Sequence, residues 1–267
     1  MQASPASAAS SSPNRATYER RDVVGQYARS HELYPAEEDI FRRHPQFSGS
    51  VLDIAMGAGR TTRALLPACE RYVGIDLSRT MIASAHEQFP DADLRVMDMR
   101  QAPERFASHR FDAILISYNS IDYIPWEDRR RLLARLPGIL VADGVLAFST
   151  HDLRSASSQR RFHLREDLRN TLHTAYRPRS LAKFLLRAPP TVLKAWRNRL
   201  RNRGMERFFG DYAYVNDDAE DYGLLTLYVS TPRQIEMLKA AGFRTVEVLQ
   251  PWLRGEPAYF NYFACRR

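Results

Sequence analysis

The fold is decided by the stretch Val51-Leu52-Asp53-Ile54-Ala55-Met56-Gly57-Ala58-Gly59-Arg60. Its first half is apolar, as in a short buried strand over 51–55. Gly57 and Gly59 follow, and glycine lets a backbone turn tightly and approach a ligand closely. A helix expected over about 60–68 then presents its N-terminal N–H groups at the same point. The stretch therefore predicts a strand, a glycine-rich turn and a helix that bind a ligand.

Strands and helices continue to alternate after this stretch. The apolar runs predict four further strands and the polar periodic segments predict helices between them. Five strands alternating with helices are typical of a doubly wound parallel α/β sheet. Asp143-Gly144 predicts a turn before the fifth strand. The expected further strands cover 72–75, 94–97, 113–117 and 145–149, and the expected helices cover 78–89, with Ser78 as N-cap, and 127–136.

The C-terminal residues 231–267 predict the end of the same core. Thr231 is expected to cap a helix that has Pro232 at its first position and ends at Gly242. Two last strands, over 245–249 and 259–265, have only a short connection. A short connection favours antiparallel pairing.

Three consecutive predicted strands end near a carboxylate, namely Asp53, Asp76 and Asp98. Asp76 follows Asp53 at close to the ~20-residue spacing at which an acidic side chain takes the ribose hydroxyls of a nucleoside. The carboxyl ends of parallel strands meet at one edge of a sheet, where open α/β sheets bind ligands. We therefore expect these three carboxylates around one crevice.

These segments resemble the class I methyltransferases that use S-adenosyl-L-methionine (SAM), whose usual first motif reads roughly LDxGxGxG. The resemblance covers about residues 48–150 and resumes at 231–267. It implies a Rossmann-like doubly wound sheet, mostly parallel with an antiparallel final strand, and SAM as cofactor. It also implies that Asp53 and the Gly57–Gly59 turn lie by the methionine part of SAM, that Asp76 holds the ribose, and that Asp98 with Met97 or Met99 flanks the adenine. The cofactor-binding residues expected on this basis are Tyr27, Asp53, Ala55, Gly57, Gly59, Arg60, Asp76, Leu77, Met97, Asp98, Met99 and Ser117.

The sequence departs from the family at Ala55, where glycine is usual. Alanine is the smallest replacement, so we expect the turn to survive. The main rival within this fold class is an NAD-binding domain, but Thr62 stands where its third glycine would be. A single GxG motif or a single aspartate at a strand end is weak evidence for a cofactor site, whereas the complete set in this order is much stronger evidence.

The methyl acceptor is expected beyond the fourth and fifth strands. His151 is a candidate base, because it titrates near neutrality and Asp122 or Asp152 can orient it. Tyr118 is the second catalytic candidate, and Asn119, Tyr123, Tyr214 and Tyr228 are candidate substrate-binding residues. The alternative for His151 is a loop histidine whose hydrogen bonds are made to the backbone. The alternative for the tyrosines is packing on the core. The loop after the fourth strand lacks the Asn/Asp-Pro-Pro-aromatic signature of enzymes that methylate nucleic-acid amines.

The chain divides into five expected parts. Residues 1–14 are rich in Ser, Ala and Pro and predict a disordered tail. Residues 15–47 predict two helices around Pro35, where related enzymes often carry a lid with aromatic residues. Residues 48–153 and 231–267 form the core, and 154–230 form a basic insertion that caps the acceptor site. Two cysteines make no disulfide framework, so a reducing cytoplasm is the expected location, and no residues have metal-ligand spacing.

The insertion carries the basic charge of the chain, with 15 Lys/Arg and 3 Asp/Glu between Arg154 and Arg207. In 183–203, Val192, Leu193, Trp196 and Leu200 have near-helical spacing among basic residues. Such a helix can lie on an anionic membrane surface, bind RNA phosphates or meet an acidic substrate. The commonest case is a helix whose apolar stripe packs on the core.

The resulting hypothesis is a SAM-dependent methyltransferase that acts on a small molecule by O- or N-methylation of a metabolite, a sugar or a lipid-linked glycan. One alternative is an RNA methyltransferase that grips RNA with its Arg-rich insertion. The other alternative is a non-catalytic binding protein with the same fold. The alanine at position 55 is the only sequence feature that favours it.

Overall fold

The computed structural model describes residues 18–29, 31–156, 193–217, 222–253, 256–258 and 260–267. The predicted tail and most of the basic insertion lie outside these residues. Among the helices that the structure describes, none has the length and apolar character needed to cross a bilayer.

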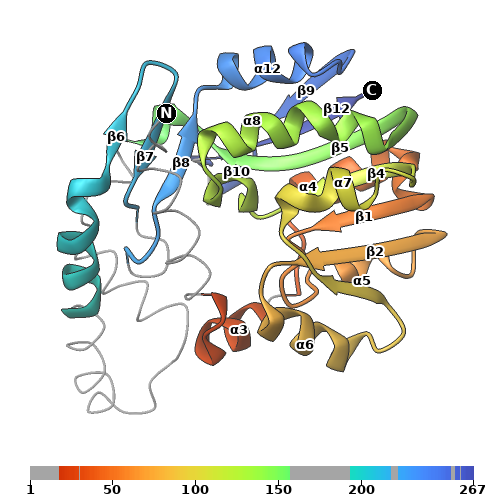
Figure 1. Cartoon of the computed structure of the whole chain (residues 1–267), viewed down its shortest axis with the longest axis horizontal. Helices are drawn as coiled ribbons and strands as arrows, with labels where there is room; N and C mark the ends of the chain where they lie inside the picture. The colour runs from red at the N-terminus through yellow and green to blue at the C-terminus, as the bar shows by residue number, and fades with distance from the viewer. Residues whose placement is uncertain (1–17, 30, 157–192, 218–221, 254–255, 259) are drawn as a thin grey trace.

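A seven-stranded sheet with the order β3-β2-β1-β4-β5-β12-β9 forms the centre of the molecule (Figure 1). The strands β1 to β5 pair in parallel, whereas β12 is antiparallel to both of its neighbours. This arrangement confirms the predicted doubly wound sheet with an antiparallel final strand. The strand bounds are β1 Ser50–Ile54, β2 Arg71–Asp76, β3 Asp93–Val96, β4 Phe111–Ile116, β5 Leu140–His151, β9 Thr245–Leu249 and β12 Phe260–Arg266.

Each face of the sheet carries its own hydrophobic core, because side chains alternate along a strand. Leu52 and Ile54 of β1 join one core, whose helical side comes from α7 Ala102–Arg105, α8 Trp126–Arg135 and α12 Thr231–Ala240. Val51 joins the other core, which is covered by α4 Pro35–Arg43, α5 Thr62–Leu65 and α6 Arg79–Gln88. The result is a three-layer sandwich whose central strands β1 and β4 are almost fully buried, as parallel strands usually are.

Several local predictions are corrected by the structure. The helix expected over 60–68 is reduced to α5, because the glycine-rich turn extends through Thr61. The expected turn at Asp143-Gly144 lies inside β5, where the register against β4 shifts and Asp143 takes a φ of 64°. Ser230, not Thr231, is the N-cap of α12, since the Thr231 hydroxyl donates a hydrogen bond to Asp152 instead.

The cap is a three-stranded antiparallel sheet of β6 Arg207–Phe208, β7 Tyr212–Val215 and β8 Thr226–Val229. It lies beside the carboxyl end of β5, where Asp152 bridges to Val229 (Figure 1). Residues 193–202 form a helix before it, at the far end of the molecule from β9. The short helix α3 Arg21–Ala28 packs beside α6.

Candidate cofactor and acceptor site

A cavity opens at the carboxyl edge of the sheet, where the ends of β1 to β4 meet. Its wall includes ten of the twelve predicted cofactor-binding residues and two of the predicted acceptor-site residues, Tyr118 and Tyr123. The cavity therefore runs from the glycine-rich turn to the loop that follows β4. The ten cofactor candidates on its wall are Tyr27, Ala55, Gly57, Arg60, Asp76, Leu77, Met97, Asp98, Met99 and Ser117.

The glycine-rich turn needs three left-handed residues, Ala55 (φ 58°), Gly57 (φ 59°) and Gly59 (φ 100°). This conformation costs an L-residue about 1–2 kcal/mol, and glycine nothing comparable. Ala55 thus adopts the backbone that the usual glycine would take, at an energetic cost. At Gly59 a Cβ atom would lie 2.6 Å from the Phe89 ring, so the space as well as the φ angle requires glycine.

Asp53 lies beneath the turn and outside the cavity wall. Its Oδ2 accepts hydrogen bonds from the Thr61 hydroxyl at 2.6 Å and the Tyr72 hydroxyl at 2.8 Å. Burial raises the pKa of this carboxyl to about 6, although both hydroxyl donors act in the opposite direction. In this structure Asp53 therefore fastens the turn to β2, and a contact between Asp53 and the cofactor stays a prediction.

Asp76 stands at the end of β2 and faces the cavity. Its two carboxylate oxygens accept the backbone N–H groups of Gly57 at 2.9 Å and Ser78 at 2.8 Å. An ionised carboxylate has about four acceptor positions, which is more than these backbone donors occupy. Burial raises its pKa to about 6, with the backbone N–H donors of Ser78, Gly57 and Leu77 opposing the shift. The carboxylate thus has acceptor capacity for the hydroxyls of a ribose.

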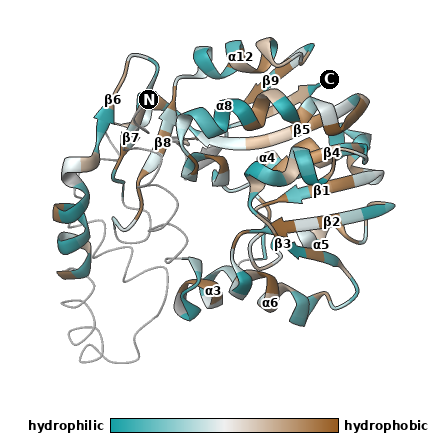
Figure 2. Cartoon of the chain, in the orientation of Figure 1, coloured by the Kyte–Doolittle hydropathy of each residue, from teal (hydrophilic) through white to brown (hydrophobic). Residues whose placement is uncertain are grey.

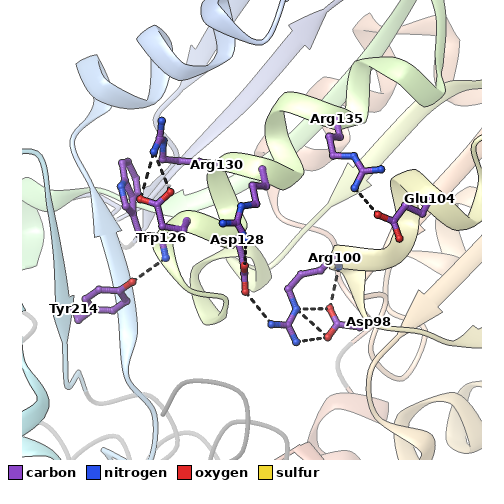
Figure 3. Close-up of polar contacts among 10 residues, drawn as sticks. Asp98, Arg100, Glu104, Trp126, Asp128, Arg130, Arg135 and Tyr214 are labelled. Carbon is purple, nitrogen blue, oxygen red and sulfur yellow. Dashed lines mark hydrogen bonds and ion pairs between the residues drawn. The ribbon is translucent and has the colours of Figure 1, made fainter. Parts of the chain in front are cut away.

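Asp98 is held by an ion-pair network that joins the end of β3 to α8 (Figure 3). The Arg100 guanidinium contacts the Asp98 carboxylate at 2.5 Å and Asp128 of α8 at 2.9 Å. The neighbouring Met97 and Met99 line the cavity beside it. Thioether side chains make favourable contacts with aromatic rings, which suits the adenine position that the sequence predicts for them.

A buried charge cluster ties the N-terminal helices to the glycine-rich turn. Glu37 of α4 is fully buried and accepts both guanidinium nitrogens of Arg60, at 2.5 and 2.7 Å. Its carboxylate also accepts the hydroxyls of Ser117 and Tyr262. Burial opposes ionisation of Glu37, but these donors and the charge of Arg60 hold its pKa below the ordinary value. Glu37 is not among the site residues that the sequence predicts; it lies only within the helices expected over residues 15–47.

The loop after β4 presents Tyr118 to the cavity through a strained backbone. Tyr118 and Asn119 are consecutive left-handed residues, with φ angles of 56° and 55°. The Ser149 hydroxyl of β5 accepts the Asn119 N–H at 2.8 Å and so supports this conformation. The Tyr118 ring lies 5.6 Å from Tyr27 and 5.5 Å from the Arg60 guanidinium carbon. Strain of this kind persists where the surroundings fix it, and it is frequent at functional sites.

His151 belongs to a buried polar network behind this loop. Asp122 accepts the His151 Nδ1 at 2.8 Å and also binds the guanidinium of the fully buried Arg129. Asp122, and not Asp152, is therefore the residue that orients the imidazole. The remaining nitrogen, Nε2, lies 3.4 Å from the Asn119 amide. His151 does not reach the cavity wall in this structure, so its role as a base stays a prediction.

The other acceptor candidates do not line the cavity. The Tyr214 hydroxyl accepts the backbone N–H of Trp126 at 2.8 Å and so joins the cap to α8 (Figure 3). The centre of the Tyr228 ring lies 4.8 Å from that of the His151 ring, with the planes tilted by 35°, and the Tyr228 hydroxyl donates to Asp217 at 3.0 Å. Asn119 lies behind Tyr118. Substrate contacts by these three residues stay predictions.

Sequence reasoning missed part of the cavity wall. Tyr18 and Met81 contribute from the N-terminal segment and α6, and Ser120, Ile124 and Pro125 contribute from the loop after β4. The signal for Tyr18 was present, since it stands with Tyr27 in the predicted lid. The small and apolar residues gave no signal, because their position depends on how the loop folds.

Comparison with known proteins agrees with this geometry. Residues 51–144 match the family model described as a methyltransferase domain. The chain is 27% identical over 190 residues to a carboxy-S-adenosyl-L-methionine synthase of Chromohalobacter salexigens, spanning 66% of this chain and 69% of that protein. It is 32% identical over 108 residues to a dTDP-3-amino-3,6-dideoxy-alpha-D-glucopyranose N,N-dimethyltransferase of Streptomyces fradiae, spanning 40% of this chain and 41% of that protein.

A solved structure shares the fold across the whole chain. It is the 1,6-didemethyltoxoflavin-N1-methyltransferase of Burkholderia thailandensis, with a TM-score of 0.60 and 14% identity, covering 100% of this chain and 92% of that one. Residues 51–144 therefore carry a methyltransferase domain, the chain has the fold of the class I SAM-dependent methyltransferases, and SAM is the cofactor. The left-handed turn, the free acceptor positions of Asp76 and the methionine-lined wall fit a nucleoside with a sulfonium side chain.

Proposed function

We propose that this methyltransferase acts on a small molecule, and that the methyl group goes to a nitrogen atom of an amine or a ring. The observation that carries the proposal is the composition of the acceptor end of the cavity. Of the described wall residues beyond Ser117, none is an Asp, Glu or His: they are Tyr118, Ser120, Tyr123, Ile124 and Pro125. A neutral amine attacks without a base, whereas an oxygen nucleophile usually benefits from one.

The residues of the wall suit this reaction in two ways. SAM, when bound, supplies a methyl group already activated by a sulfonium, so positioning and exclusion of water account for much of the catalysis. The rings of Tyr18, Tyr27 and Tyr118 stand around the cavity and attract a cation by their π faces. The strained Tyr118–Asn119 backbone fixes the ring that stands next to the acceptor.

The similar proteins support a small acceptor. One relative is named for N,N-dimethylation of a nucleotide-linked amino sugar, and the B. thailandensis neighbour for N1-methylation of a toxoflavin precursor. In both names the acceptor atom is nitrogen. Tyr18 and Tyr27 of the N-terminal segment form part of the cavity wall, which is compatible with a small acceptor.

The test is formation of S-adenosylhomocysteine from SAM with matched acceptor pairs, each an amino sugar or ring nitrogen beside its hydroxyl analogue. We expect turnover with nitrogen acceptors and less than a tenth of that rate with the oxygen analogues. For an amine, kcat/KM rises with pH towards the pKa of the acceptor itself, and it does so in His151→Gln as in the wild type. Transfer to oxygen that is lost in His151→Gln would overturn the proposal and restore His151 as the base.

A further inference from the structure

The helix of residues 193–202 packs on the cap with its small and polar face. Ala195 and Asn202 are buried, and the Asn202 amide donates to the Tyr222 carbonyl at 3.0 Å. The Arg199 guanidinium lies over the Tyr222 ring, 5.0 Å from its centre. Two polar side chains of the helix therefore contact Tyr222. The prediction that the apolar stripe packs on the core is wrong for the described residues Leu193, Trp196 and Leu200, which are exposed.

The apolar stripe of this helix faces outward instead. Leu193, Trp196 and Leu200 are 62%, 55% and 50% exposed. At about 100° per residue these three side chains fall within roughly 60° of one another around the helix. Most large apolar residues of a folded protein are buried, so three exposed ones in a row on one face need an explanation.

Basic residues flank the stripe. On the same helical projection Arg197 and Arg201 fall beside Leu193, within about 80° of it. Both are exposed. Between 193 and 209 the chain has six Lys/Arg and one Glu, and Figure 2 shows this helix as mostly hydrophilic, with a few hydrophobic positions. Exposed Phe208 and Phe209 follow in and after β6.

We propose that the outer face of helix 193–202 docks on an anionic phospholipid surface. A helix with Leu and Trp on one side and arginines beside them lies in the interface of a bilayer, with its apolar side chains at the acyl boundary and its cations at the headgroups. Trp is the residue best suited to that interface. A second copy of the chain fits poorly as the occupant, since the pairing would bring two strongly basic faces together.

The consequence is an orientation of the enzyme on the membrane. Helix 193–202 is joined to the cap through Tyr222, and the cap is joined to α8 through Tyr214. Docking therefore holds the cap against the lipid surface, while the outer edge of the sheet at β9 points away (Figure 1). This arrangement suits an acceptor that is carried at, or delivered from, the bilayer.

The experiment is co-sedimentation of the full chain with vesicles of phosphatidylcholine alone or with 30% phosphatidylglycerol added, at low salt. We expect binding to the anionic vesicles only. The triple variant Leu193→Ser, Trp196→Ser, Leu200→Ser should lower the partition coefficient at least tenfold. Arg197→Gln with Arg201→Gln should lower it by about fivefold per arginine. Val248→Ser, at an exposed apolar position on β9, is the matched control and should change nothing.

Unchanged SAM binding and circular dichroism show that the variants are folded, which is expected because the replaced side chains are exposed. Equal binding to neutral vesicles, equal binding by the triple variant, or no binding at all would each overturn the proposal. Tight salt-dependent binding to RNA, with none to vesicles, would also overturn it and would assign the face to nucleic acid.

Discussion

The buried pair Glu37–Arg60 gives a stability prediction that can be worked from its contacts. Glu37 is fully buried and the Arg60 side chain is 10% exposed. Breaking such a pair by removing one charge leaves the other uncompensated, at a cost of about 3–5 kcal/mol. We therefore expect Glu37→Gln, which keeps the shape and one acceptor, to lower the free energy of unfolding by about 3 kcal/mol or more.

A double-mutant cycle separates the pair from the individual side chains. Arg60→Met alone should also destabilise, because the Glu37 carboxyl then has no counter-charge. Glu37→Gln combined with Arg60→Met removes both charges, and the double variant should regain about 2 kcal/mol relative to the sum of the single effects. Urea unfolding of the cofactor-free protein measures all four forms. Additive effects, or a loss below about 1 kcal/mol for Glu37→Gln, would refute the conclusion that this pair holds α4 on the glycine-rich turn.

Four further substitutions have expected outcomes. Ala55→Gly removes the cost of a left-handed alanine and should raise the free energy of unfolding by about 1 kcal/mol. Gly59→Ala should lower it by about 2 kcal/mol or more, because the added Cβ meets the Phe89 ring. The urea midpoint measures both changes. Burial raises the pKa of Asp53 to about 6, so the unfolded state loses its proton at lower pH than the folded state, and ionisation favours unfolding. As pH rises from about 4 to 7, the free energy of unfolding of Asp53→Asn should therefore increase by about 2–3 kcal/mol relative to that of the wild type. Tyr214→Phe removes the acceptor for an α8 N–H and should cost about 1 kcal/mol by the same assay.

The core of the fold could be predicted from local patterns. The central strands β1 and β4 are short apolar runs. Ser78 caps α6, and its hydroxyl accepts the Met81 N–H as expected. The order of strands then follows from general rules of connection. Periodicity also predicted the helix around Trp196, but it shows only which face is apolar. What covers that face depends on the rest of the cap.

The site could be predicted to the level of the sheet edge, and no further. Asp53, Asp76 and Asp98 all stand at strand ends, yet only Asp76 and Asp98 line the cavity. The Asp53 side chain meets Thr61 and Tyr72, and sequence spacing does not show on which side of the turn a carboxylate lies. Glu37 is the converse case. From the sequence, an acidic residue in the first turn of a helix is expected to be exposed, and Glu37 is buried only because α4 packs over the glycine-rich turn.

Calorimetry with SAM and S-adenosylhomocysteine tests most directly whether SAM binds beside Asp76. The wild type should bind in the micromolar range, about −8 kcal/mol. Asp76→Ala should lose at least about 1.5 kcal/mol of that, because hydrogen bonds to a charged group are broken. Asp91→Ala, at an exposed aspartate before β3, should bind as the wild type does. Wild type that binds neither ligand, or Asp76→Ala that binds both unchanged while folded, would contradict the account.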